Sequence, residues 1–182
     1  MKTIVQQIMG SGFDGHIIIV SNPVDIMSYY VYKISGLPAS QVIGSGTTLD
    51  TARLKYFIAQ KIQVDPRSVH ALVIGEHGDS EMKKDTIQAG WEIFNRKGNT
   101  CYGIASSTVG IVKTILHNEN KILPVSTLLQ GQYGQDQLYI SVPAIIDKSG
   151  VREIVELHMT DEEMQEFQKS CDHLKSFYDC LD

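Results

Sequence analysis

The stretch that decides the fold is His16-Ile17-Ile18-Ile19-Val20-Ser21-Asn22-Pro23-Val24-Asp25. Its first half is a short apolar run rich in β-branched residues, which is typical of a strand covered on both faces in a parallel sheet. Its second half contains a proline and turns the chain. From there a helix is predicted to about Ser35, with Gly36 as its stop. A strand, a turn and a helix in this order form the repeating unit of α/β folds.

The residues on either side continue this pattern. Apolar residues at helical spacing predict a helix over residues 4–9, which the glycines of Gly10-Ser11-Gly12 end. Downstream, residues 41–43 and 69–74 are predicted to be two further short strands, with a helix over residues 49–62 between them. The first half of the chain is therefore predicted to be α/β, with a parallel sheet of the Rossmann type.

The second half predicts an α+β arrangement instead. Its expected elements are, in order, helices over residues 83–96 and 102–117, an antiparallel strand pair at 123–129 and 138–146, a strand at 151–157, and a last helix opened by the capping box Thr160-Asp161-Glu162-Glu163. The sequence contains no internal repeat and no low-complexity linker. An α/β part is thus expected to precede an α+β part.

The composition narrows the class of protein. The 182 residues are 42% apolar and 20% charged, as in ordinary globular proteins. A net charge of −5 without a basic run argues against nucleic acid and anionic membranes as partners. Apolar runs stay far below the ~20 residues of a membrane span, and the N-terminus has no signal-peptide pattern. Three cysteines without paired spacing suggest reduced thiols, so we expect a soluble, cytoplasmic protein.

Two segments could carry chemistry. Gly75-Glu76-His77-Gly78-Asp79 places an imidazole after a predicted parallel strand, where open α/β sheets place ligands, and a capping or turn histidine is the alternative for His77. Asp50 and Arg53 share one face at the start of a helix and could be a solvated ion pair. Together the three suit proton transfer on a small carboxylate substrate. A carboxylate orients a histidine that exchanges protons near neutral pH, and an arginine binds a carboxylate through two parallel hydrogen bonds.

Three motifs of this chain resemble motifs of the L-lactate dehydrogenase family, above all of its bacterial members, in their order and in their spacing. They are Ser21-Asn22-Pro23-Val24-Asp25, Gly44-Ser45-Gly46-Thr47-Thr48-Leu49-Asp50-Thr51-Ala52-Arg53 and Gly75-Glu76-His77-Gly78-Asp79-Ser80. Lys97-Gly98-Asn99-Thr100 and the ending from Val151 onward are similar to that family as well. The resemblance extends over nearly the whole chain.

The resemblance implies a role for each matching residue. His77 would give and take the proton of the substrate, with Asp50 as its carboxylate partner and Arg53 holding the substrate carboxylate. The implied substrate-binding residues are Asn22, Asp25, Asp50, Arg53 and Thr100; the implied cofactor-binding residues, for NAD, are Thr3, Val20, Ser21, Asn22 and Ser45. The Asn22–Pro23 bond is a candidate cis peptide, with a trans proline in the first helical turn as the alternative.

The resemblance also implies regulation. In members activated by fructose 1,6-bisphosphate, the effector binds to a basic residue and a histidine, which correspond to Lys55 and His70 here. The family usually has arginine at the first position, and lysine supplies the charge without the planar fork. His70 could equally be an ordinary strand histidine. Family members are homotetramers, so we expect an allosteric homo-oligomer.

Part of the family pattern is expected to be missing. Members begin with a dinucleotide-binding half that carries Gly-x-Gly-x-x-Gly, and we expect this loop to be absent from the chain. The loop with the arginine that polarises the substrate carbonyl would also lie upstream. We therefore interpret residues 1–46 as the end of the dinucleotide-binding domain and residues 47–182 as the substrate and catalytic domain, with an internal deletion after residue 82.

The function that the resemblance implies is NAD-dependent interconversion of pyruvate and L-lactate, in glycolysis and in fermentation of pyruvate to lactate, by a partial and poorly active form. A malate-type 2-hydroxy acid dehydrogenase is the alternative in the same class, although Thr100 and Ile104 favour lactate. Two other classes stay open. The chain could be a non-catalytic fragment that associates with full-length subunits, or a module that binds a sugar bisphosphate.

Overall fold

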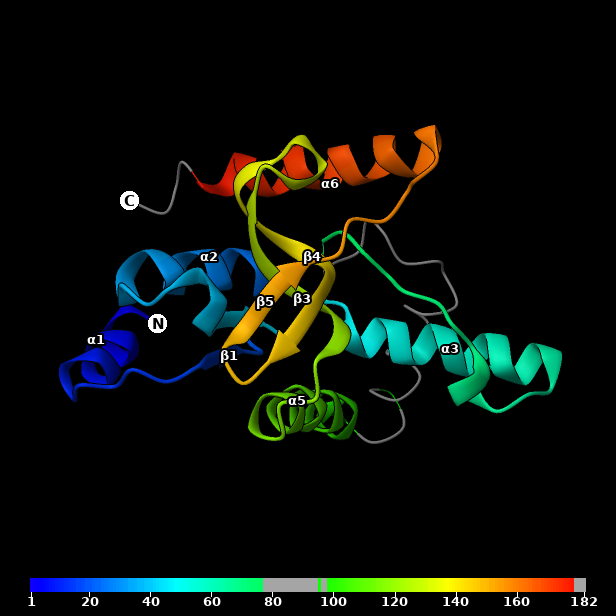
Figure 1. Cartoon of the computed structure of the whole chain (residues 1–182), viewed down its shortest axis with the longest axis horizontal. Coiled ribbons are helices and arrows are strands. Elements are labelled where there is room, and N and C mark those ends of the chain that lie inside the picture. The colour runs from blue at the N-terminus through cyan, green and yellow to red at the C-terminus, as the bar shows by residue number, and fades with distance from the viewer. Residues whose placement is uncertain (77–94, 96–97, 179–182) are drawn as a thin grey trace.

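A computed structural model describes residues 1–76, 95 and 98–178 of the chain (Figure 1). Its helices are α1 (Lys2–Gly10), α2 (Val24–Ser35), α3 (Thr48–Ile62), α5 (Cys101–Leu116) and α6 (Asp161–Tyr178). Its strands are β1 (Ile17–Ile19), β2 (Val42–Gly44), β3 (Lys121–Gln130), β4 (Asp136–Asp147) and β5 (Gly150–Ile154), and short 3-10 turns cover Ala39–Gln41, Pro66–Ser68 and Gln132–Gly134.

Within these ranges the strands form one mixed sheet in the order β1-β2-β3-β4-β5. β1 and β2 are parallel, whereas β2 with β3, β3 with β4 and β4 with β5 are antiparallel. The predicted α/β and α+β parts therefore share a sheet, and the pairing of Gly44 with Ser126 joins them. The predicted domain boundary after residue 46 falls just beyond β2 and stays a prediction.

Glycine makes this junction possible. A Cβ atom placed on Gly44 would lie 2.6 Å from the Cβ of Ser126, and one placed on Gly46 would lie 2.6 Å from the Ser126 nitrogen. No real Cβ tolerates either distance, so the backbone at the end of β2 approaches β3 only because both side chains are absent.

Helices cover both faces of the sheet. In Figure 1, α2 and α6 lie on one side of the strands and α5 lies on the other. Neighbouring residues of β2 point to opposite sides, as strand geometry requires: Val42 packs in the cluster with α1 and α2, and Ile43 packs against Ile111 and Ile115 of α5. No helix among the described residues has the length and apolar content to cross a bilayer.

Most of the predicted elements are confirmed. α1, β1, α2, β2, α3, α5, the β3–β4 hairpin, β5 and α6 all occur close to their predicted positions. Gly36 ends α2 with a φ of 71°, and the Asn22–Pro23 bond is cis, as expected. The capping box is also present, because the Glu163 amide donates to the Thr160 hydroxyl while the Thr160 amide donates to the Glu163 carboxylate. The helix predicted over residues 83–96 lies outside the described residues apart from position 95.

The strand predicted over residues 69–74 is wrong. In the structure this segment belongs to no strand, and only Gly75, directly after it, makes an isolated antiparallel bridge, with Ser141 of β4. The place beside β2 that a third parallel strand would take is occupied by β3. A short apolar run predicts burial but does not say which neighbour covers it.

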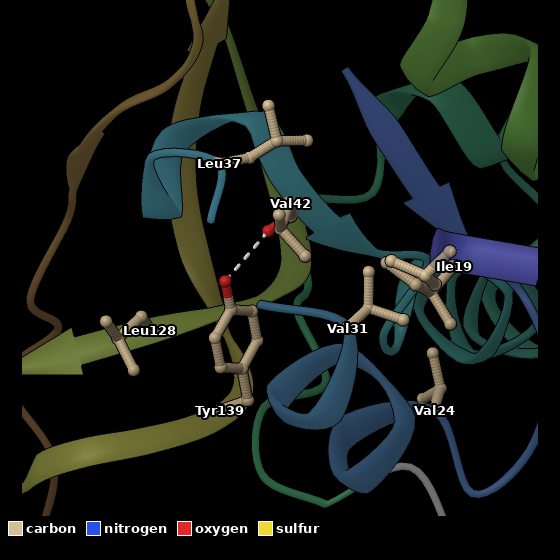
Figure 2. Close-up of a cluster of buried hydrophobic side chains, with 8 residues drawn as sticks. Ile19, Val24, Val31, Leu37, Val42, Leu128 and Tyr139 are labelled. Carbon is tan, nitrogen blue, oxygen red and sulfur yellow. Dashed lines mark hydrogen bonds between the residues drawn. The ribbon is translucent and has the colours of Figure 1, made fainter. Parts of the chain in front are cut away.

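One buried tyrosine links the α/β part of the fold to the α+β part. Tyr139 of β4 donates a hydrogen bond from its hydroxyl to the carbonyl of Val42, 3.1 Å away, among the apolar side chains of α2 and β1 (Figure 2). Burial raises the pKa of Tyr139, and the neighbouring Tyr32 and Tyr178 raise it further, so the hydroxyl keeps its proton and remains a donor.

We therefore expect Tyr139→Phe to lower the free energy of unfolding by about 1 kcal/mol, because it leaves a buried carbonyl without this donor. Tyr56→Phe is the control, since it removes an exposed hydrogen bond with Gln60 that water replaces. Urea denaturation of the three proteins measures the difference. Equal losses for both variants would contradict a role of Tyr139 in the core.

The face of α5 that points away from the sheet is apolar, like the face that packs on it. Tyr102, Val109 and Leu116 are 74%, 64% and 76% exposed, while Ile111 and Ile115 on the opposite face are buried against the sheet. Several exposed apolar side chains on one helix face often mark a surface that another chain covers. We expect the isolated chain to self-associate or to bind dyes that report exposed apolar surface.

Leu116→Glu should therefore shift the chain toward the monomer in sedimentation analysis and reduce dye binding. Lys113→Gln, which lies on the same helix and changes the net charge by the same amount, should have no such effect. A wild-type chain that is monomeric and binds no dye would contradict this expectation.

Candidate active site

The candidate site begins where the parallel strands end. β1 ends at Ile19, and Val20, Ser21 and Asn22 follow it on the surface before the cis proline leads into α2. β2 ends beside it, and the Ser45 amide donates a hydrogen bond of 2.8 Å to the carbonyl of Ile19. The carboxyl ends of parallel strands are where open α/β sheets bind ligands. Three of the predicted cofactor residues are thus exposed together at this edge.

The first two turns of α3 carry Asp50 and Arg53, which are three residues apart. Asp50 is fully buried, and its Oδ1 lies 3.6 Å from Nη1 of Arg53, whose side chain is 18% exposed. The alternative of a solvated ion pair is therefore wrong for Asp50, although the pair itself is formed. Asp50 also lies near the N-terminal end of the helix, where the helix dipole favours negative charge. An arginine has five N–H donors, so one contact with Asp50 leaves others to meet a second carboxylate.

The segment before His77 lies against this turn. The Val73 carbonyl accepts a hydrogen bond from the hydroxyl of Thr47, the N-cap residue of α3, and the Val73 amide donates one to the hydroxyl of Thr51 in its first turn. Two residues further on, the amide and carbonyl of Gly75 bond to the backbone of Ser141. His77 itself lies outside the described residues. Because residues 69–74 form no strand, it does not follow a parallel strand as predicted.

The remaining predicted site residues are spread over the structure. Thr100 is exposed at the start of α5, and this helix lies close to α3, since a Cβ on Gly103 would be 3.1 Å from Leu49. Asp25 is buried in the first turn of α2 and adds to the raised pKa of Tyr178, which burial raises most. Asp25 is thus placed in the core rather than at the exposed edge. Ser45 is also buried, and Thr3 is exposed on α1.

The two predicted effector residues lie on neighbouring elements. Lys55 is half-buried on α3, and His70 is exposed just after the turn Pro66–Ser68, which packs on the same helix. Among the described residues, no hydrogen bond or ion pair joins the side chains of Lys55 and His70.

One glycine pattern escaped the sequence prediction. Gly10, Gly12 and Gly15 have the spacing Gly-x-Gly-x-x-Gly, so the pattern expected to be absent does occur. The structure places these glycines between the end of α1 and the start of β1. The dinucleotide-binding loop needs the opposite order, a strand followed by a helix whose N-terminus meets the pyrophosphate. The match is therefore one of spacing alone.

Sequence reasoning also missed Thr47 and Thr51, which contact Val73. The signal available was two threonines four residues apart at a helix start, where side chains at this spacing share a face.

Among the described residues, no group of histidines, cysteines and carboxylates is arranged to hold a metal ion.

Comparison with known proteins extends over the whole chain. Residues 1–44 match the family model of the lactate/malate dehydrogenase NAD binding domain. Residues 47–84 and 80–181 match, in two pieces, the model of the lactate/malate dehydrogenase alpha/beta C-terminal domain.

Individual relatives agree with these matches. The chain is 44% identical over 207 residues to L-lactate dehydrogenase 1 of Listeria monocytogenes, an alignment that covers 98% of this chain and 66% of the relative. The chain thus spans about two thirds of the length of that protein.

Solved structures of similar fold include both enzyme types. The ligand-bound minor L-lactate dehydrogenase of Enterococcus mundtii has a TM-score of 0.92 at 42% identity, over 100% of this chain and 68% of that one. The malate dehydrogenase of Aeropyrum pernix has a TM-score of 0.90 at 33% identity, over 98% of this chain and 67% of that one. Since the models of both halves match and these relatives align over nearly the whole sequence, the chain belongs to the lactate/malate dehydrogenase family.

Proposed function

We propose that the chain is a partial form of an NAD-dependent L-lactate dehydrogenase, which interconverts pyruvate and L-lactate. The observation that carries this proposal is the buried Asp50 on the first turn of α3, beside Arg53 of the next turn, in a chain 44% identical to a lactate dehydrogenase. A carboxylate and a guanidinium at this spacing can serve a proton-transferring histidine and a substrate carboxylate together.

Each residue has one task in this proposal. His77 takes the proton of the lactate hydroxyl in oxidation and returns it to the carbonyl oxygen of pyruvate in reduction. Asp50 orients the His77 ring and stabilises its protonated form. Arg53 binds the substrate carboxylate through its remaining N–H donors, and Asn22 donates from the exposed edge toward the reacting oxygen. Thr100 lines the substrate pocket from the start of α5.

The exposed edge fits the nicotinamide end of NAD. Val20, Ser21 and Asn22 are accessible there, with Val20 46% exposed and apolar enough to face a flat ring. NAD, when bound, supplies the hydride chemistry of the reaction. Ser45 contributes by holding β1 through its amide rather than by exposing its side chain. The described residues include no Gly-x-Gly-x-x-Gly loop that leads from a strand into a helix, and the turn Gly44-Ser45-Gly46 before α3 packs against β3 instead, so they fit the pyrophosphate less well.

A malate-type enzyme is the second candidate. The similarity to the Aeropyrum pernix malate dehydrogenase supports it, and Arg53 would bind a carboxylate of either acid. Ile104, half-buried on α5 beside the turn that carries Thr100, favours the smaller and less charged lactate.

The alignments support an internal deletion. The Listeria alignment runs over 207 positions, although the chain has 182 residues, so at least 25 positions of that alignment face no residue here. The C-terminal family model also matches in two pieces that meet at residues 80–84, close to the predicted break after residue 82. We infer the same division into residues 1–46 and 47–182. Cytoplasmic localisation, assembly as a homotetramer and activation by fructose 1,6-bisphosphate through Lys55 and His70 stay predictions.

The first functional prediction concerns the cofactor. We expect NADH to bind the 182-residue chain weakly, without saturation in the micromolar range, because the described residues contain no Gly-x-Gly-x-x-Gly loop from a strand into a helix that would hold the pyrophosphate. Fluorescence titration measures this, with the Listeria enzyme as the positive control. Micromolar affinity for NADH would contradict the expectation.

The second concerns catalysis in a hybrid that supplies the residues this chain lacks from the Listeria enzyme. There, Asp50→Asn should lower kcat by about 10²-fold or more, since it removes the charge that stabilises the protonated His77. Arg53→Lys should chiefly raise KM for pyruvate, because an ammonium cannot form two parallel hydrogen bonds.

An exposed pair of the same composition provides matched controls. Arg67 and Asp65 form an ion pair of 2.7 Å on the surface, so Asp65→Asn and Arg67→Lys should leave both constants unchanged. If Asp50→Asn left kcat and its pH profile unchanged, His77 would be a turn histidine and the proposed function would be wrong.

A further inference from the structure

Two threonines at the start of α3, the N-cap residue Thr47 and Thr51 of the first turn, bind both backbone groups of a single residue. The Thr47 hydroxyl donates a hydrogen bond of 2.5 Å to the carbonyl of Val73, and the Val73 amide donates one of 2.9 Å to the Thr51 hydroxyl. Thr47 is 1% and Thr51 5% exposed, so water does not compete for either bond. Because residues four apart lie on one face of a helix, the two hydroxyls together replace the strand partner that Val73 lacks.

Other threonine hydroxyls of the described helices behave differently. Those of Thr48, Thr108 and Thr114 each donate to a carbonyl three or four residues earlier in their own chain segment. Such bonds are local and common. The bonds of Thr47 and Thr51 instead reach across 26 and 22 residues of sequence to a separate segment. They are therefore tertiary contacts.

These contacts join the two parts of the candidate site. Asp50 lies between Thr47 and Thr51 in sequence, on the turn that faces Val73. Val73 stands four residues before His77, and the intervening Gly75 is held by two backbone bonds to Ser141 of β4, 2.9 and 3.2 Å long. The segment is thus attached to α3 at one residue and to the sheet two residues later. Ile74 between them packs in the cluster formed with α6.

We propose that Thr47 and Thr51 are positioning residues, which set the placement of the segment leading to His77 relative to Asp50. This inference rests on the proposed function. Acid–base pairs require placement within about 0.5 Å, and a buried double hydrogen bond restrains a backbone segment at this scale. The β-branched threonine side chain also has few rotamers, which limits the directions that the two hydroxyls can take.

The test uses the full 182-residue chain and mass spectrometry. Thr51→Val removes the hydroxyl at nearly constant shape, Thr51→Ser keeps it, and Thr48→Val removes a neighbouring hydroxyl that does not contact Val73. Amide hydrogen exchange of the peptide with Val73 reports the contact. The pH dependence of His77 modification by diethyl pyrocarbonate, which reacts with the neutral imidazole, reports the histidine's titration.

In Thr51→Val, exchange at Val73 should rise on the order of tenfold, because one buried hydrogen bond is lost. The midpoint of His77 modification should move to lower pH by about 0.5 unit, toward its value in Asp50→Asn, since a less closely held carboxylate favours the imidazolium less. Thr51→Ser should restore both readouts, and Thr48→Val should leave both at the wild-type values.

A change in Val73 exchange without a shift of the His77 midpoint would overturn the positioning role and leave the proposed function intact. An unchanged midpoint in Asp50→Asn would overturn the proposed function and this inference with it. If Thr51→Val fails to fold, Thr47→Val, which removes only the bond to the Val73 carbonyl, provides the same two readouts.

Discussion

The rest of the structure depends on how closely the backbone at Gly44 and Gly46 approaches β3. A Cβ on Gly46 would lie 2.7 Å from the Ser141 hydroxyl as well as 2.6 Å from the Ser126 nitrogen. Ser126 and Ser141 face each other across the β3–β4 hairpin and are fully buried. The serines have small side chains and the glycines have none. The parallel strands, the hairpin and the start of α3 can therefore approach one another closely at this place.

Ser141 connects this point with the segment that leads to His77. Its side chain meets the glycine turn, while its backbone bonds to Gly75. The same turn begins α3, whose hydroxyls bond to Val73. The segment, the helix with Asp50 and the hairpin are therefore attached to one another without sharing a regular strand. The segment is thus held by hydrogen bonds at Val73 and Gly75, although it is itself irregular.

The sequence predicted those elements whose own residues determine them. The β-branched run at residues 17–19, the glycine after α2 and the reciprocal bonds of the capping box each depend on local chemistry and are confirmed. The strand at residues 69–74 failed because its apolar run fits any buried segment, and β3 occupies the place beside β2. The roles of Thr47 and Thr51 depend on a partner 22 to 26 residues away, which no local pattern reveals. Spacing also gave the pair Asp50 and Arg53, but not the burial of Asp50.

The burial of Asp50 bears on the function of the site more than on the stability of the fold. Removing a carboxylate from water costs several kcal/mol, and the ion pair at 3.6 Å to a partly exposed arginine offsets part of this cost. Replacing a whole buried ion pair by apolar residues is often neutral or stabilising, so stability alone does not explain why the pair of Asp50 and Arg53 is kept. A buried charge that stability does not require is retained most readily where it acts on another group. Asp50 lies on the turn that holds Val73, and from Val73 the chain continues directly to the histidine that would need this charge.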